Sequence, residues 1–248
     1  MRYLILSDIH SNLEAFAACV QRGKQAGYDS VLCCGDIVGY GPSPIEAIDG
    51  IRGLNALTIR GNHDRVVAGL DEPTQFNPHA RRAVYWTRAA LPESYREYLA
   101  SLPIGPLEVT SEAQLVHGAI THQDDYIFTD ADADENFLLA AKPLTFFGHS
   151  HFPVTFCADK LGNTFEAPMY DCDEFIVVKC EAGKRLLVNP GSVGQPRDGD
   201  PRASFAIWDA DHDRIELYRV EYDVKLTQEK MRNAELPNYL IDRLAHGR

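Results

Sequence analysis

Side chains that bind metals recur at five places in the sequence, each directly after a short apolar run. The five segments are Asp8-Ile9-His10, Gly35-Asp36, Gly61-Asn62-His63-Asp64, His117-Gly118 and Gly148-His149-Ser150-His151. They offer carboxylate, amide and imidazole groups and no thiolate. Such ligands suit Mn²⁺, Fe, Co²⁺, Zn²⁺ or Ni²⁺, and they suit Cu(I) or an iron–sulfur cluster poorly. The pattern therefore predicts a site for divalent transition metals.

The spacing within two of these segments pairs the ligands. Residues i and i+2 at the end of a strand point the same way. Asp8 and His10 can therefore meet one ion, and His149 and His151 can do the same.

Together the segments supply more ligands than one ion needs. Seven side chains are candidate metal ligands: Asp8, His10, Asp36, Asn62, His117, His149 and His151. His63 is left over. Two ions that share a carboxylate would use the whole set. Their four positive charges exceed the two carboxylate charges, so the site would attract an anionic phosphate. Two ions about 3.5–4 Å apart can hold the attacking and leaving oxygens of an in-line displacement.

Each segment alone also has a plain structural interpretation. Asp8 and Asp36 could cap helices, and residues 61–64 could form a turn. Five recurrences at the ends of apolar runs favour the metal site over these separate explanations.

The apolar runs themselves indicate an α/β protein. Runs at 2–7, 30–34 and 54–59 predict buried parallel strands, and the stretches at 13–26 and 44–52 between them have helical spacing. This β-α-β-α-β order brings the carboxyl ends of the strands to one edge of a sheet. The candidate ligands follow those ends.

The rest of the chain reads as further helices and a mainly β second half. Helices are expected at 62–70, 78–90, 93–101 and 134–142, and two more in 223–246, divided by Pro237. A hairpin is expected within 107–116, followed by strands at 144–147, 153–157, 163–167, 174–180, 184–188, 203–209 and 214–222. The simplest division is one domain, 1–248, with two sheets that helices cover on their outer faces.

Composition limits the possible partners. The 248 residues include 24 Lys and Arg against 36 Asp and Glu, a net charge of −12. This balance argues against broad binding to nucleic acid or to anionic membranes. The six cysteines lack CxxC spacing and read as reduced thiols, with a Cys172–Cys180 bond as the less favoured alternative. No leader or spanning run is visible, so a cytoplasmic protein is expected. The sequence carries no signal for an oligomeric state.

In order and composition, the five segments resemble the five-block signature of the calcineurin-like metallophosphoesterase superfamily. The resemblance covers residues 8–151. Asn189-Pro190-Gly191-Ser192-Val193 is also similar to a block of its small bacterial and archaeal phosphodiesterases. The family implies a four-layer α-β-β-α sandwich of two mixed sheets. The length of 153–188 predicts an added β-hairpin region over or beside the site, and 223–248 would be a helical tail.

The resemblance also implies a role for each candidate residue. One metal would take Asp8, His10 and His151, the second would take Asn62, His117 and His149, and Asp36 would bridge them. His63 would protonate the leaving oxygen, oriented by a carboxylate such as Asp64. The implied enzyme is a phosphodiesterase with two divalent transition-metal ions, and Mn, Fe, Zn, Ni and Co stay open, with Mn²⁺ as a guess among them. A metal-bridging hydroxide would attack the phosphorus in line.

The expected substrate is a small phosphoester, with a nucleotide derivative as one option. Val38-Gly39-Tyr40-Gly41 replaces the Asp-Arg-Gly of the superfamily's protein phosphatases, which argues against a phosphoprotein. Arg197 and Tyr40 are weak candidates for substrate binding, and Arg202 fits a solvated turn better. A phosphomonoesterase, a dinucleoside-polyphosphate hydrolase and a catalytically silent interaction module stay open as alternatives.

Overall fold

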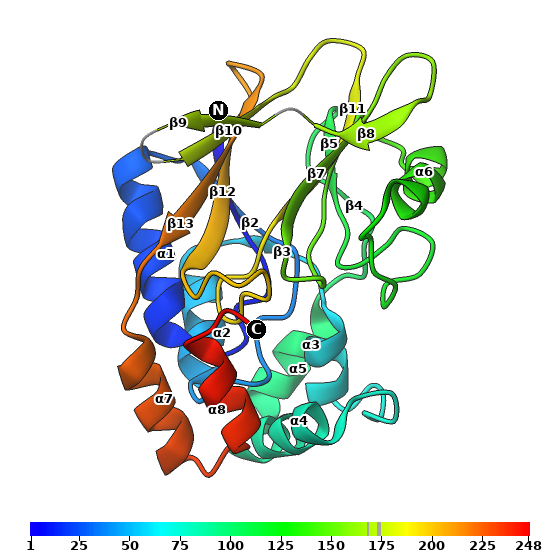
Figure 1. Ribbon diagram of the computed structural model, residues 1–248. Coiled ribbons are helices and arrows are strands. Elements are labelled where there is room, and N and C mark those ends of the chain that lie inside the picture. The colour runs from blue at the N-terminus through cyan, green and yellow to red at the C-terminus, as the bar shows by residue number, and fades with distance from the viewer. Residues whose placement is uncertain (168, 173–174) are drawn as a thin grey trace.

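In the computed structural model, two mixed β-sheets pack face to face and helices cover their outer sides (Figure 1). The structure describes residues 1–167, 169–172 and 175–248, without the side chains of 169–172. One sheet contains β1 (Arg2–Leu6), β2 (Ser30–Cys33), β3 (Leu57–Thr58), β9 (Met169–Cys172), β10 (Phe175–Lys179), β12 (Ala203–Asp209) and β13 (Arg214–Val220). The other contains β4 (Leu107–Glu108), β5 (Ala113–Leu115), β6 (Leu144–Phe146), β7 (Pro153–Ala158), β8 (Thr164–Glu166) and β11 (Arg185–Pro190).

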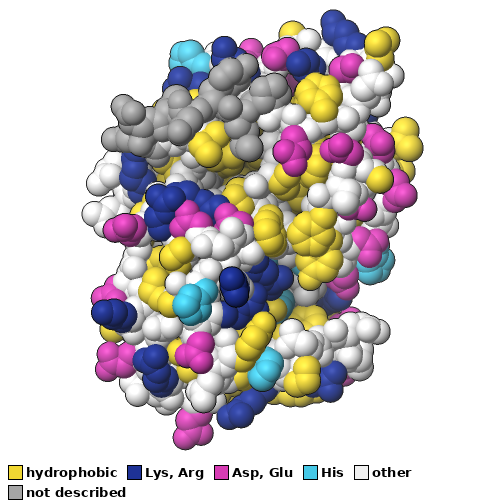
Figure 2. Space-filling model, viewed as in Figure 1, with side chains coloured by type: hydrophobic (Ala, Val, Ile, Leu, Met, Phe, Trp, Pro, Cys, Tyr) yellow, Lys and Arg dark blue, Asp and Glu magenta, His cyan; other side chains and the backbone are white. Residues whose placement is uncertain are grey.

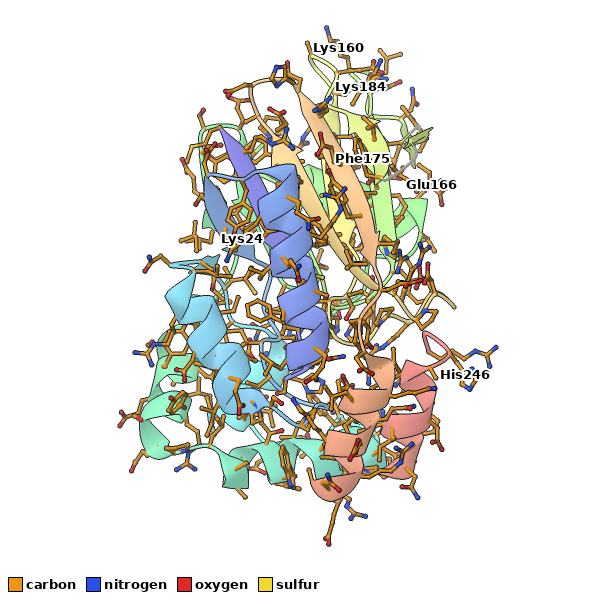
Figure 3. All side chains as sticks on the ribbon, turned by 90° about the vertical axis from the view of Figure 1, so that its left-hand side faces the viewer. Lys24, Lys160, Glu166, Phe175, Lys184 and His246 are labelled. Carbon is orange, nitrogen blue, oxygen red and sulfur yellow. The ribbon has the colours of Figure 1, made fainter. Side chains whose placement is uncertain are left out.

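Helices occupy both outer faces and one end of this sandwich. They are α1 (Leu13–Ala26), α2 (Pro44–Gly53), α3 (Asn62–Val67), α4 (Pro78–Ala90), α5 (Glu93–Ser101), α6 (Asp130–Leu139), α7 (Val224–Asn233) and α8 (Asn238–Leu244). Figures 1 and 3 show α1 against the seven-stranded sheet, and Figure 1 shows α6 beside the other sheet. The predicted four-layer α-β-β-α arrangement is confirmed.

The period of two along β1 divides its side chains between two cores. Leu4 and Leu6 pack with Phe16 of α1 on the outer face of the sheet. Tyr3 and Ile5 point the other way and join the core between the two sheets. A third core lies between the second sheet and α6. Each layer boundary therefore has its own apolar cluster.

Parallel pairing brings the candidate ligands to one edge. The seven-stranded sheet has the order β3-β2-β1-β12-β13-β10-β9, with β2 parallel to both β1 and β3. The six-stranded sheet has the order β4-β5-β6-β11-β7-β8, with β6 parallel to β5 and β11. Four of the five segments lie in the loops that follow β1, β2, β5 and β6, and the segment after β3, Gly61–Asp64, forms the start of α3.

Two predicted elements differ clearly from the structure, and one strand was not predicted. The strand expected at 54–59 pairs only over Leu57–Thr58, because the chain is still turning at Asn55, whose φ is 48°. The helix expected at 134–142 spans Asp130–Leu139, because Thr129 caps it and accepts from the backbone N–H of Asp132. Strand β9 was not expected.

The described residues of 153–179 form two edge hairpins, whereas 185–188 belong to β11, which lies between β6 and β7. β7 and β8 pair antiparallel and extend the six-stranded sheet. β9 and β10 do the same for the seven-stranded sheet. Residue 174, included in the predicted strand 174–180, lies outside the described residues.

The C-terminal tail forms the two expected helices, with Pro237 at the start of α8. Met231 and Leu240 from this tail pack in a cluster with Tyr40 and Ala80. Among the described residues, no helix is both long and apolar enough to cross a membrane. Five cysteines are free thiols, whereas the side chain of Cys172 lies outside the described part, so the alternative bond to Cys180 stays untested.

Candidate metal centre

The structure brings six of the seven candidate ligands together in two buried groups, and the seventh, Asn62, lies against His117 of the second group. Asp8, His10 and His151 form one group, in which the ligand atoms lie within 4.8 Å of one another. Asp36, His117 and His149 form a second group that meets the same limit. Each side chain is at least nine-tenths buried.

Asp36 lies between the two groups. Its Oδ2 is 3.6 Å from Nε2 of His10 and 3.5 Å from Nε2 of His117. Its Oδ1 accepts a hydrogen bond from the backbone N–H of His63 at 2.8 Å, which fixes the carboxylate. One oxygen of Asp36 therefore faces both groups at once.

Backbone carbonyls fix the orientation of all four candidate histidine ligands. The bonds run from Nδ1 of His10 to Val38 O (3.0 Å), from Nδ1 of His117 to Cys34 O (2.8 Å), from Nδ1 of His151 to Gln195 O (2.6 Å) and from Nε2 of His149 to Asp124 O (3.0 Å). A carbonyl only accepts, so each of these nitrogens carries the proton. The other nitrogen of each neutral ring is left with a lone pair for an ion.

The resulting donor set fits divalent metals. Nε2 of His10 lies 3.1 Å from Nε2 of His151, so two lone pairs face each other in the neutral rings. Nε2 of His117 lies 3.0 Å from the amide oxygen Oδ1 of Asn62. Lone pairs this close repel one another unless a proton or a metal ion lies between them.

The carboxylates create a field that favours a cation. Burial disfavours the charged form of His117, but Asp36 and Asp8 outweigh it and raise the pKa of His117 to about 10. Burial also opposes the charge of Asp36, yet His117, His63 and His10 hold its pKa well below the usual range. Burial raises the pKa of Asp8 to about 7. Asp36 is thus the carboxylate that stays ionised most firmly.

Close backbone approach at this edge depends on glycine. A Cβ on Gly61 would lie 2.1 Å from Oδ1 of Asp36, and one on Gly148 would lie 2.0 Å from Oγ of Ser7. Several site residues themselves adopt left-handed backbone conformations, with φ of 48–66°: Asp8, His10, Ser11, Asp36, Tyr40, His149 and His151. Such conformations are uncommon for residues with a Cβ and cluster at functional sites.

His63 lies beside the cluster and is held mainly by aromatic rings. Its ring centroid is 4.8 Å from that of His10, 4.4 Å from Tyr40 and 4.6 Å from Phe76. Burial lowers the pKa of His63 to about 4. A ligand atom of His63 also lies within 4.8 Å of His10 and Asp36, so metal binding is a second geometric option for it.

Asp64 does not orient the His63 ring as expected. Its Oδ1 accepts from the backbone N–H of Val38 and its Oδ2 from that of Gly61, both at 3.1 Å. Nδ1 of His63 has no hydrogen-bond partner among the described residues. Asp64 instead ties the start of α3 to the loop after β2, because helix N-termini present unpaired N–H groups that a carboxylate satisfies.

A polar pocket of about 120 Å³ opens onto the cluster. Tyr40 and Arg197, the two substrate candidates, both line it. Nη2 of Arg197 makes long contacts of 3.4 Å to Tyr40 and Gln195, and its Nε has no hydrogen-bond partner among the described residues. Arg197 therefore keeps donors for a ligand. The guanidinium of Arg202 instead donates hydrogen bonds to Asp200, which agrees with the predicted solvated turn.

Two aromatic residues of the pocket wall were not anticipated. Phe76 precedes α4, and Tyr126 lies in the loop between β5 and α6. The sequence signal was an alternation of aromatic residues, Tyr126 and Phe128, inside an otherwise polar loop.

Comparisons with known proteins establish the family and the fold of the chain. Residues 1–213 match the calcineurin-like phosphoesterase superfamily domain. The chain is 39% identical to the uncharacterised protein MJ0912 of Methanocaldococcus jannaschii, over 98% of this chain and 97% of that protein. It is 40% identical to a metallophosphoesterase from Sphaerobacter thermophilus, with full coverage of both chains and a TM-score of 0.86. The hypothetical protein PH1004 from Pyrococcus horikoshii shares the fold at 23% identity, with a TM-score of 0.80 over 100% of this chain and 98% of that one.

Proposed function

The chain belongs to the calcineurin-like phosphoesterase superfamily, and on that premise we propose that it is a dinuclear metal-dependent phosphodiesterase acting on a small phosphoester. The observation that carries this proposal is the position of Asp36. Its Oδ2 faces a ligand group on each side, as a carboxylate shared by two ions would.

Each proposed ion has three ligands of its own besides Asp36. Asp8, His10 and His151 would hold the first ion, and Asn62, His117 and His149 the second. Bound ions would supply positive charge for the phosphate oxygens and would activate a water molecule near neutral pH. The oxygen and imidazole donors suit Mn²⁺, Fe, Co²⁺, Zn²⁺ and Ni²⁺ alike, and we use Mn²⁺ as the first test ion.

His63 is the proposed proton donor to the leaving oxygen. It lines the pocket, and its backbone is held by Asp36. An anionic ester arriving beside the ring would favour the imidazolium form, which burial disfavours in the free protein. A general acid must lie within hydrogen-bond reach of the oxygen that it protonates, and the pocket lining allows this.

Arg197 is proposed to hold a non-bridging phosphate oxygen. Among the described residues, it is the one cationic Lys or Arg that lines the pocket. The guanidinium would add its charge to that of the proposed ions, and its planar set of N–H donors suits phosphate oxygens. The choice of a phosphodiesterase over a phosphomonoesterase rests on the similarity of Asn189-Pro190-Gly191-Ser192-Val193 to a block of the family's small phosphodiesterases.

The test begins with protein stripped of metal by a chelator. Mn²⁺ or another divalent ion is then added back, and hydrolysis of aryl mono- and diesters, cyclic nucleotides and dinucleoside polyphosphates is measured. We expect turnover only with added metal, and faster turnover of diesters. Two bound ions per chain without hydrolysis of any ester would instead favour the silent interaction module.

A further inference from the structure

A stack of aromatic rings leads from the metal centre to the surface. The ring of Tyr126 stacks on that of His149, with centroids 4.3 Å apart and planes inclined by 16°. Phe128 stacks on Tyr126 at 5.1 Å and 20°. Phe152 then meets Phe128 edge-on at 5.8 Å and 85°. We refer to Tyr126, Phe128 and Phe152 as the aromatic platform.

The platform is exposed, which separates it from the core aromatics. Tyr126 is 44% exposed, Phe128 51% and Phe152 36%. Figure 2 shows hydrophobic side chains gathered near Lys and Arg side chains in the middle of one face. Single exposed apolar residues are common, but a contiguous group marks a site of interaction.

The loop that carries Tyr126 and Phe128 is firmly held. Asp124 accepts two hydrogen bonds from the guanidinium of Arg65, at 3.0 and 2.6 Å. The backbone oxygen of Asp124 accepts from His149, and that of Asp125 accepts from Ala119 at 3.0 Å. The platform is therefore fixed relative to α3, which also carries Asn62 and His63. A rigid aromatic surface loses little entropy when a ligand stacks on it.

The platform also adjoins the place where a phosphate would bind. Tyr126 lines the pocket together with Arg197 and His63. The pocket, at about 120 Å³, has room for a phosphoryl group but not for a whole nucleotide. An ester group attached to that phosphate must leave the pocket, and Tyr126 offers it an apolar path outward.

We propose that the aromatic platform binds a planar aromatic ring, such as a nucleobase, of the phosphoester whose phosphate occupies the pocket. This inference rests on the proposed phosphoesterase function for the position of the phosphate. Stacking is worth about 1–3 kcal/mol per base and tolerates every base, because each base has a π-face. A preference for nucleotides with little discrimination among the four bases is the result.

The probes are two monoesters that differ only by the base, AMP and ribose 5-phosphate. Their dissociation constants are measured by calorimetry with the metal-loaded protein, which requires no turnover. We expect AMP to bind about tenfold more tightly, since each factor of ten corresponds to about 1.4 kcal/mol. The variant Phe128→Ala should bring the ratio of the two dissociation constants close to one, and the affinity for ribose 5-phosphate should stay unchanged. Metal content is measured alongside.

Tyr85→Ala is the matched control, because Tyr85 is an exposed tyrosine on α4 outside the pocket lining. This variant should keep the wild-type ratio between the dissociation constants of ribose 5-phosphate and AMP. Equal affinity of the wild-type protein for both probes would overturn the inference, and so would an unchanged ratio in Phe128→Ala and Phe152→Ala. A concentration-dependent dimer that Phe128→Ala dissolves would assign the platform to a second copy, and so would also overturn it.

The binding and hydrolysis measurements test the platform and the proposed function independently. A base-dependent affinity in a protein that hydrolyses no ester would contradict the proposed function and support the platform. Hydrolysis of aryl diesters by a protein that binds both probes equally would contradict the platform alone.

Discussion

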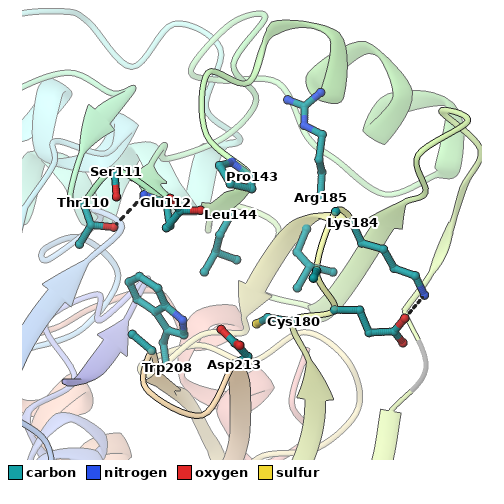
Figure 4. A pocket seen from close by; sticks show the side chains of 15 residues that line it. Thr110, Ser111, Glu112, Pro143, Leu144, Cys180, Lys184, Arg185, Trp208 and Asp213 are labelled. Carbon is teal, nitrogen blue, oxygen red and sulfur yellow. Dashed lines mark hydrogen bonds and ion pairs between the residues drawn. The ribbon is translucent and has the colours of Figure 1, made fainter.

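Two cavities lie at opposite ends of the sandwich, and they differ in almost every respect. One is the pocket of about 120 Å³ over the metal-ligand cluster. The other, of about 640 Å³, lies between the far ends of the two sheets (Figure 4). Figure 3 shows Lys184, which lines the larger cavity, far from His246 in the C-terminal tail. The larger cavity would be the first choice by size.

The smaller cavity nevertheless has the features that chemistry requires. Buried ligand atoms converge on it, and backbone carbonyls fix the histidine rings around it. The larger cavity is lined by Leu144, Leu186 and Trp208, and two of its charged side chains, Lys184 and Glu181, pair with each other. Convergent polar atoms with fixed orientation therefore identify a reaction site better than volume does.

The largest effect is expected from Asp36→Asn. The neutral amide of asparagine lacks the negative charge that a carboxylate shares between two cations. The Mn²⁺ content should therefore fall, and hydrolysis should drop below detection. Metal analysis and turnover of an aryl diester measure the two effects. Asp213→Asn, in the larger cavity, is the matched control and should retain both. Full metal occupancy in Asp36→Asn would contradict the bridging position.

His63→Ala should lower kcat by about 10²–10⁴, because a general acid is lost. The metal content should stay at the wild-type level, since the proposed ligands are complete without His63. A loss of one ion from His63→Ala would show instead that His63 is a ligand.

Arg197→Met should lower kcat/KM about 10–100-fold, because a hydrogen bond between charged groups contributes roughly 1.5–3 kcal/mol. Methionine keeps part of the apolar stem and removes the charge. Arg197→Lys keeps the positive charge but not the planar guanidinium, so it should recover part of the loss in kcat/KM. Wild-type kinetics in Arg197→Met would remove Arg197 from substrate binding.

The smallest effect on activity is expected at the larger cavity. Trp208 is buried there and stacks on Tyr3, with centroids 4.8 Å apart. Trp208→Leu should cost about 2–4 kcal/mol in the free energy of unfolding, measured by denaturant titration. At a temperature where the variant is folded, kcat/KM should change less than twofold. A large change in kcat/KM would mean that the two ends are coupled.

The sequence was most informative where one physical rule decides the structure. Parallel strands of one sheet end at one edge, so Asp8, Asp36 and Asn62 could be placed together from the runs that precede them. The start of α6 was misjudged, because the capping pair Thr129 and Asp132 decides it and the apolar spacing does not.

Partners that depend on tertiary approach were beyond the sequence. Asp64 was assigned to the neighbouring His63, but its oxygens bind the backbone of Val38 and Gly61, and the approach of the loop after β2 decides this. Tyr126 was missed for the same reason. Its stacking on His149 joins two loops on separate strands, and no local pattern specifies such a contact.

The carbonyl partners of the four candidate histidine ligands determine when the ligands become ordered. Those carbonyls belong to loops that form as the sheets assemble, so the rings acquire their tautomer and direction during folding. We therefore expect the entropy of ordering them to be lost in folding and not in metal binding, in contrast to small zinc domains that fold only with metal. Ion exchange in this protein should accordingly proceed within a folded chain, and far-UV circular dichroism should change little on chelation.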